Sequence, residues 1–291
     1  MFKGVFTALV TPFLQDGRID EKALRQLIDI QLENKIDGLV PMGTTGESPT
    51  LNHDEHIQVI KLVVEQTKGQ VPIIAGTGSN CTDEAISLSR RAKDLGVAAT
   101  LQVAPYYNKP TAEGFYRHFM KIADSVDLPL VVYNIPGRSG KNIENETMLR
   151  LAKHSNIVGV KEASGDINQV MDLIARKSAD FIVLSGDDNL VYPMIALGAT
   201  GIISVASNLV PGRMVEFVHA ALEGNFLRAR ELHYSLLPLF KGIFLETNPI
   251  PIKAALVMKN MMEEVYRLPM CPMSADNKQK LRDILANLKV L

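Results

Sequence analysis

A short apolar run followed by a helical pattern recurs eight times, and this alternation constrains the fold more than any other feature of the sequence. The expected strands occupy residues 5–10, 38–40, 72–76, 99–103, 130–134, 157–160, 181–184 and 201–204. Continuous apolar strands are typical of a parallel sheet covered on both faces. Eight such units in about 222 residues are close to the size of a (β/α)8 barrel. The sequence therefore predicts an α/β fold, a TIM barrel, over residues 1–223.

Polar residues and prolines mark the expected starts of several helices. Asp20 has the character of an N-cap, the second helix begins near Asn52, and Thr82 is a candidate cap of the third. Another helix follows Asp166, and Pro211 is expected to begin the last helix of the barrel.

Beyond Gly224 the strand pattern disappears. Helical patterns near 225–240, 249–260 and 274–291 predict a small all-helical extension over residues 224–291. The competing fold is an open dinucleotide-binding sheet, but residues 9–13 after the first strand lack the Gly-rich turn that such a sheet requires.

Composition excludes several classes of protein. The chain has 291 residues, 46% of them hydrophobic, and a net charge of −1, so a large core is expected and nucleic acid is not expected as a partner. The two cysteines, Cys81 and Cys271, lie far apart, which suits a reducing compartment. We also expect no membrane span and no signal peptide, and hence a cytoplasmic protein.

The apolar run 157–160 ends at Lys161. A buried ammonium is costly, and a lysine with a lowered pKa is a nucleophile that can form a Schiff base with a carbonyl compound. The alternative is that Lys161 lies one residue past the strand, solvated or paired with Glu162. This stretch alone does not decide between the two.

The carboxyl ends of the strands form the working face of such a barrel. Thr44 and Thr45 stand there between glycines, where the loop is suited to bind a small carboxylate or is an ordinary turn. Tyr133 is either a proton shuttle or a core tyrosine, and Arg138 is either a carboxylate clamp or a surface residue. Tyr107 and the neighbouring Tyr106 are expected either to pack at the rim of the barrel or to form a pair at an interface between chains.

His53 and His56 are spaced for a metal, but no third ligand is evident, so a solvated helix face is the simpler interpretation. The other histidines are scattered, which argues against a zinc-dependent aldolase, and no metal site is predicted.

Five motifs together resemble the dihydrodipicolinate synthase family of pyruvate-dependent class I aldolases, over essentially the whole chain. They are the segments 43–48 (GTTGES), 106–110 (YYNKP), 133–138 (YNIPGR), 159–166 (GVKEASGD) and 247–251 (TNPIP).

The resemblance implies the roles of individual residues. Lys161 is expected to form the imine with pyruvate, Tyr133 to move protons, and Thr44 to link Tyr133 to Tyr107, which serves the neighbouring subunit. The residues expected to bind substrate are Thr45, Arg138, Gly186 and Ile203.

The resemblance further implies condensation of pyruvate with L-aspartate 4-semialdehyde to 4-hydroxy-tetrahydrodipicolinate, a lyase reaction of lysine biosynthesis. No cofactor beyond the covalent imine is expected, and the expected assembly is a homotetramer built from tight dimers. A feedback site for lysine is expected at Ser48, Pro49, His53, His56, Asn80, Glu84 and Tyr106.

Two alternatives remain at this point. The first is an N-acetylneuraminate lyase or a keto-deoxy sugar acid aldolase of the same superfamily, which usually lacks the counterpart of Arg138. The second is a non-catalytic pyruvate-binding regulator, which is expected to lose Lys161, Tyr133 or Thr44, whereas all three are present.

Overall fold

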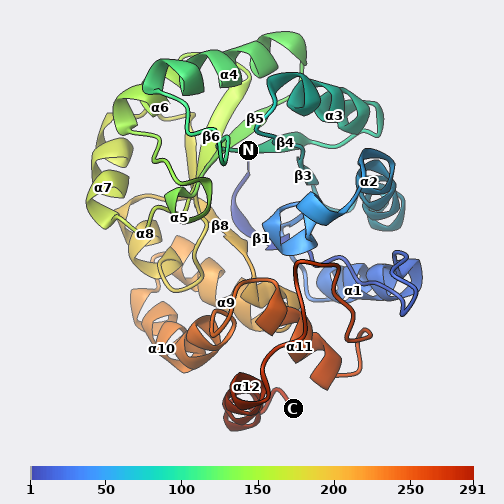
Figure 1. Ribbon diagram of the computed structural model, residues 1–291. Helices are drawn as coiled ribbons and strands as arrows, with labels where there is room; N and C mark the ends of the chain where they lie inside the picture. The colour runs from blue at the N-terminus through green and yellow to red at the C-terminus, as the bar shows by residue number, and fades with distance from the viewer. Residues whose placement is uncertain (1) are drawn as a thin grey trace.

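The computed structural model describes residues 2–291 and has a parallel sheet surrounded by helices (Figure 1). Its strands are β1 (Gly4–Ala8), β2 (Gly38–Val40), β3 (Ile74–Gly76), β4 (Ala99–Val103), β5 (Leu130–Asn134), β6 (Ile157–Glu162), β7 (Ile182–Ser185) and β8 (Gly201–Ser204). The spatial order is β2-β1-β8-β7-β6-β5-β4-β3, and a parallel bridge between Leu39 and Ile73 joins the two ends. The predicted (β/α)8 barrel is therefore confirmed.

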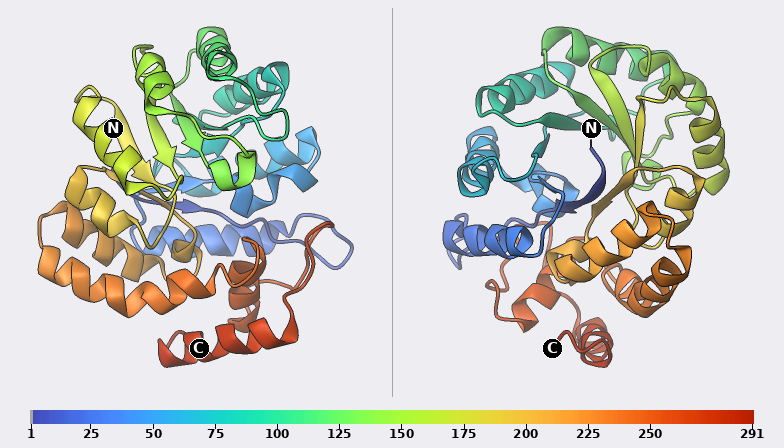
Figure 2. Two further views of the ribbon diagram at one scale, coloured as in Figure 1. Left: turned by 60° about the vertical axis from the view of Figure 1, so that its left-hand side comes forward. Right: turned by 180° about the vertical axis from the view of Figure 1, so that it is seen from behind.

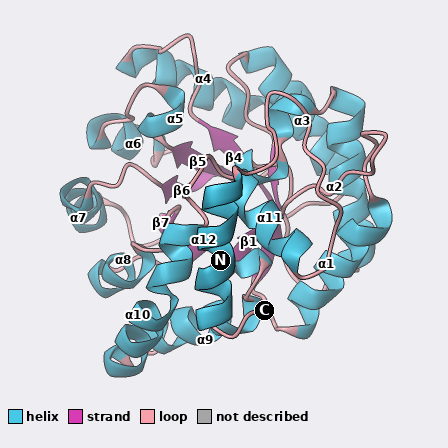
Figure 3. Ribbon diagram, turned by 60° about the horizontal axis from the view of Figure 1, so that its bottom comes forward, coloured by secondary structure: helices cyan, strands magenta, loops and turns pink. Residues whose placement is uncertain are grey.

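Helices cover the outside of this sheet, which Figure 3 shows as magenta strands inside a ring of cyan helices. They are α1 (Glu21–Glu33), α2 (His53–Thr67), α3 (Thr82–Asp94), α4 (Ala112–Ser125), α5 (Pro136–Ser139), α6 (Asn145–Leu151), α7 (Ile167–Arg176), α8 (Val191–Leu197), α9 (Pro211–Leu222), α10 (Phe226–Gly242), α11 (Ile250–Met258) and α12 (Ala275–Asn287). None of the helices in residues 2–291 combines the length and the apolarity that crossing a bilayer requires.

Most predicted helix starts are correct. Asp20 and Asp166 accept backbone N–H groups at the starts of α1 and α7, and Asn52 forms a capping box with Glu55 on α2. The cap predicted at Thr82 is wrong. Cys81 holds the cap position, and Thr82 is the first residue of α3, with its hydroxyl 2.9 Å from His118 Nδ1 on α4.

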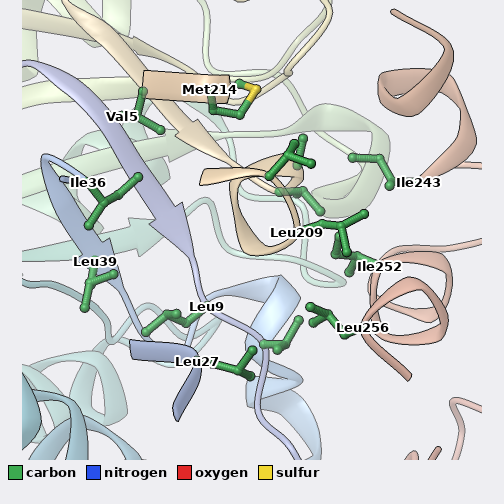
Figure 4. Packing of buried hydrophobic residues seen from close by; sticks show 14 of the residues in the cluster. Val5, Leu9, Leu27, Ile36, Leu39, Leu209, Met214, Ile243, Ile252 and Leu256 are labelled. Carbon is green, nitrogen blue, oxygen red and sulfur yellow. The ribbon is translucent and has the colours of Figure 1, made fainter. Parts of the chain in front are cut away.

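The barrel has an inner and an outer apolar core. Tyr133, Leu184 and Ile203 belong to the inner cluster, nearly all of whose residues lie on the strands. The largest outer cluster runs from β1 and α1 into the C-terminal helices. Figure 4 shows Ile252 and Leu256 of α11 in this cluster together with Leu209. These helices lie beside α1 and α9 in both views of Figure 2. The division of the chain after residue 223 stays a prediction.

Candidate active site

Lys161 lies within β6, not beyond it. The strand continues to Glu162, two residues further than its apolar run indicated, and Lys161 pairs in register with Tyr133 of β5. Lys161 is only 6% exposed, and its Nζ lies 4.1 Å from the centroid of the Tyr133 ring. The amine and the phenol therefore meet inside the barrel.

The alternative pairing of Lys161 with Glu162 is wrong. Successive side chains of a strand point to opposite faces. Glu162 instead accepts hydrogen bonds from the Asn134 side chain at 3.0 and 3.3 Å and from the Ser164 amide at 2.7 Å. Its carboxylate therefore braces the ends of β5 and β6, and the Lys161 amine stays available for chemistry.

Burial is the main cause that lowers the pKa of Lys161, to about 8. The carboxylates of Asp187 and Asp188 oppose this shift, and the nearby Arg138 guanidinium adds to it. The strand end thus produces an amine that is partly neutral near physiological pH, as a Schiff-base lysine requires.

Tyr133 remains a protonated phenol in this setting. Burial and the charge of Asp187 raise its pKa, while Arg138 and a hydrogen bond with Thr44 act in the opposite direction. A phenol that keeps its proton beside an amine can donate that proton as charge develops on a reacting carbonyl oxygen.

Thr44 and Thr45 lie in a single 3-10 turn, η1 (Thr44–Gly46), at the end of β2. The amides of Gly46 and Glu47 close this turn on the carbonyls of residues 43 and 44, each at 3.1 Å. Anion binding by this loop would therefore use the hydroxyls and the remaining amides of Thr44 and Thr45. The Thr45 hydroxyl accepts a hydrogen bond from Asn248 Nδ2 at 3.0 Å.

Arg138 lies on α5, the short helix that follows β5. Its guanidinium donates to the backbone carbonyl of Asn248 at 3.0 Å, and its side chain is otherwise exposed at the rim. Arg138 lines the same cavity as Thr44, and its charge lowers the pKa of both Lys161 and Tyr133.

Gly186 and Ile203 complete the wall of this space. A Cβ on Gly186 would lie 3.1 Å from Lys161 Cε and 2.6 Å from Ala163 Cβ, so a side chain there would crowd the reacting amine. Ile203 is fully buried in the same inner cluster as Tyr133.

Tyr107 is not part of this group within one chain. Its side chain is 89% exposed, and its backbone has a positive φ of 69°, which is uncommon outside glycine. A tyrosine held in this way projects from the rim toward solvent or toward another molecule.

A cavity of about 390 Å³ opens beside the active site. Of the residues predicted to bind lysine, it is lined by Ser48, Pro49, His53, His56, Glu84 and Tyr106, and it also reaches Thr44 and Arg138. Asn80 instead donates to the backbone carbonyl of Tyr106 at 3.2 Å.

His56 is a buried, neutral member of this cavity. Its Nε2 contacts the Gly76 carbonyl at 2.7 Å, and burial lowers its pKa to about 4. His53 and His56 thus belong to the cavity wall. In residues 2–291 no group of three or more His, Cys, Asp or Glu side chains is arranged as a metal site.

The comparison with family models bears directly on this geometry. The model of the dihydrodipicolinate synthetase family matches residues 1–288. The chain belongs to this family. A relative from Methanothrix thermoacetophila, named 4-hydroxy-tetrahydrodipicolinate synthase, is 50% identical over all of this chain and 98% of its own length.

Solved structures of the dihydrodipicolinate synthetase family have the same fold. The chloride-inhibited enzyme from Acinetobacter baumannii, in complex with pyruvate, superimposes with a TM-score of 0.99 at 42% identity, with full coverage of both chains. The enzyme from Cyanidioschyzon merolae with lysine bound has a TM-score of 0.97 at 39% identity, covering 100% of this chain and 99% of that one.

Several residues without a predicted role lie next to Lys161, Thr45 and Arg138. Asn248, from the motif 247–251, contacts both Thr45 and Arg138. Asp187 and Asp188 directly follow Gly186, and their position after a strand end is the signal that identifies them.

Proposed function

We propose that the protein condenses pyruvate with L-aspartate 4-semialdehyde to 4-hydroxy-tetrahydrodipicolinate through an imine on Lys161. The observation that carries the proposal is the buried Lys161 amine, with its lowered pKa, against the protonated phenol of Tyr133. Membership of the dihydrodipicolinate synthetase family and the names of its relatives support the same reaction.

The reaction begins at the neutral Lys161 amine. The amine adds to the ketone carbon of pyruvate, Tyr133 supplies the proton to the departing oxygen, and water leaves as the imine forms. Loss of a proton from the pyruvate methyl group gives an enamine, whose carbon attacks the aldehyde. The amine of the semialdehyde then displaces Lys161 and closes the ring, so the enzyme returns to its starting state with one water released overall.

The other residues hold the two substrates. The hydroxyl of Thr45 is placed to hold the pyruvate carboxylate, with Gly186 and Ile203 as the walls of the pyruvate pocket. Thr44, whose side chain lowers the pKa of Tyr133, extends the proton path toward the rim. Arg138 binds the carboxylate of the semialdehyde, for which an exposed guanidinium at the rim is suited. The side chains supply this chemistry without a metal or a further cofactor.

The sugar acid aldolase and the non-catalytic regulator are less well supported. The relatives are named for the synthase reaction, and Lys161, Tyr133 and Thr44 are assembled as catalysis requires. Arg138 at the rim suits a short aldehyde that carries a carboxylate.

Lysine is the proposed inhibitor, bound in the cavity of about 390 Å³. Its amino and carboxylate groups would meet Glu84 and the polar side chains of Ser48, His53 and His56. The related structure with lysine bound supports a lysine site in this family.

We further propose a homotetramer of tight dimers in which Tyr107 enters the neighbouring active site. The 89% exposure of Tyr107 supports a contact between chains. A cytoplasmic location is proposed because the two cysteines are free thiols, as in a reducing compartment.

The decisive experiment combines trapping with turnover. Borohydride reduction with labelled pyruvate is expected to modify Lys161, and Lys161→Ala is expected to abolish both the label and nearly all turnover. A coupled assay then compares aspartate 4-semialdehyde with N-acetylneuraminate. Labelling of a different lysine would contradict the mechanism, and turnover of the sugar acid alone would overturn the choice of substrate.

A further inference from the structure

A lysine and a glutamate form a buried ion pair that the proposed chemistry does not use. Lys253 of α11 has no exposed surface, and its ammonium pairs with the carboxylate of Glu47, itself 2% exposed. The ammonium also donates to the Val265 carbonyl at 2.8 Å and lies 4.6 Å from the Phe13 ring centroid. Because an apolar pair of similar size often stabilises a fold as well as a buried ion pair does, stability alone does not explain these charges.

Glu47 is the residue that ends the catalytic turn. It has a left-handed backbone with φ 55°, which a non-glycine residue seldom adopts unless its surroundings impose it. Its amide donates to the Thr44 carbonyl at 3.1 Å, and its own carbonyl accepts from the Thr50 amide at 2.9 Å. The position of the Glu47 side chain therefore sets the position of the turn that carries Thr44 and Thr45.

The segment that supplies Lys253 also holds the other part of this turn. Asn248 lies just before α11, donates to the Thr45 hydroxyl at 3.0 Å and accepts from Arg138 at 3.0 Å. One C-terminal segment thus contacts the catalytic turn at Thr45 through Asn248 and at Glu47 through Lys253.

The Arg267 region adds a second support to the same carboxylate. The Arg267 amide donates to Glu47 Oε2 at 3.4 Å, while its guanidinium binds Glu55 at 2.6 and 2.8 Å and the Gly17 carbonyl at 2.8 and 3.1 Å. Glu47 is therefore held between the C-terminal segment and the barrel rim.

We propose that the Lys253–Glu47 pair positions the catalytic turn, with Lys253 acting through Glu47 to hold Thr44 against Tyr133 and Thr45 against the pyruvate carboxylate. Lys253 is a positioning residue in this scheme and not a catalytic one. The inference rests on the roles proposed above for Thr44 and Thr45, and it makes the C-terminal helices a working part of the active site.

The test uses Lys253→Met, which keeps an unbranched side chain one heavy atom shorter and removes its charge. Active sites are first counted by borohydride trapping of pyruvate, so that unfolded protein does not enter the rates. The kcat per trapped site is expected to fall about tenfold or more, and the KM for pyruvate to rise about threefold or more, because small displacements of reacting groups are costly. Loss of stability alone would lower the number of trapped sites and leave both constants unchanged.

The double variant Glu47→Gln with Lys253→Met separates the effect of losing the position of the turn from the effect of leaving a buried charge unpaired. It leaves no uncompensated buried charge, so it is expected to resist urea better than Lys253→Met alone while remaining as slow. If Lys253→Met does not fold, the double variant is measured in its place. If the folded variant has the wild-type kcat per trapped site and the wild-type KM for pyruvate, the positioning role of Lys253 is wrong.

Lys278→Met is the matched control. It removes the Lys278–Glu264 pair, with both contacts at 2.7 Å, from the same C-terminal region without touching the catalytic turn. Its kinetic constants are expected to match wild type, and an equal loss there would contradict a specific role of Lys253. Failure of the wild-type protein to trap pyruvate would instead refute the proposed function itself.

Discussion

At the scale of single residues, the structure explains how a strand-end lysine becomes a nucleophile. Lys161 shares its burial with Tyr133, and burial shifts the pKa of each toward the neutral form: down for the amine, up for the phenol. For Lys161, burial is the largest cause, Arg138 contributes in the same direction, and Asp187 and Asp188 limit the shift.

The pKa of Lys161 predicts how imine formation depends on pH. Below a pKa of about 8 the ammonium dominates, so the reactive fraction falls about tenfold for each unit of pH below 8 and levels off above it. Quenched-flow trapping of the pyruvate imine at saturating borohydride measures this rate between pH 6 and 9.5. A rate that is flat from pH 6 to 8 would show that another step limits imine formation or that the pKa of Lys161 is much lower.

Arg138→Ala is expected to damage the second substrate selectively. Loss of a charged partner for the semialdehyde carboxylate is expected to lower kcat/KM for that aldehyde roughly 10- to 100-fold. Pyruvate trapping on Lys161 is expected to persist, with a pKa somewhat above 8 because a nearby positive charge is gone. Arg150→Ala serves as control, since Arg150 is an exposed arginine paired with Glu113; normal semialdehyde kinetics in the Arg138 variant would refute its role.

At the scale of elements, a buried carboxylate joins the ends of two neighbouring strands. Asp188, just past β7, accepts from the Ser204 hydroxyl at 2.5 Å and from the amides of Val205 and Ala206 at 3.1 Å each, just past β8. These contacts fix the two strand ends that carry Gly186 and Ile203, the walls of the proposed pyruvate pocket.

Asp188→Ala is expected to destabilise the protein by on the order of 3 kcal/mol, because it leaves three donors without their buried acceptor. The midpoint of urea unfolding, followed by circular dichroism, measures the loss. Asp172→Ala removes a carboxylate that pairs with Arg176 at the surface, and it is expected to leave the midpoint of urea unfolding nearly unchanged. Similar losses in the two variants would mean that Asp188 is not the joint between the strands.

At the scale of the whole molecule, the sequence predicted most features that depend on local pattern. Buried strands, helix caps and the rim position of Lys161 follow from the order of apolar and polar residues in short windows. The contact between Arg138 and Asn248 spans 110 residues, and that between Glu47 and Lys253 spans 206. No periodicity encodes such contacts, because they arise only when the C-terminal segment folds back against loops that follow β2 and β5.

The proposed exchange of Tyr107 between subunits makes the last prediction. Tyr107→Phe and Lys161→Ala each remove one component of every site, so each variant alone is expected to be nearly inactive. In a mixed dimer, the Tyr107→Phe chain keeps its lysine and receives an intact tyrosine from its partner, so one of the two sites is complete. Unfolding and refolding the two variants together in equal amounts is therefore expected to restore about a quarter of wild-type activity, since about half of the dimers are mixed and each has one complete site of two.

Each variant refolded alone is the control. If Tyr107 acted within its own chain, no mixture would contain a complete site. The absence of any recovery would then show that Tyr107 serves the active site of its own chain.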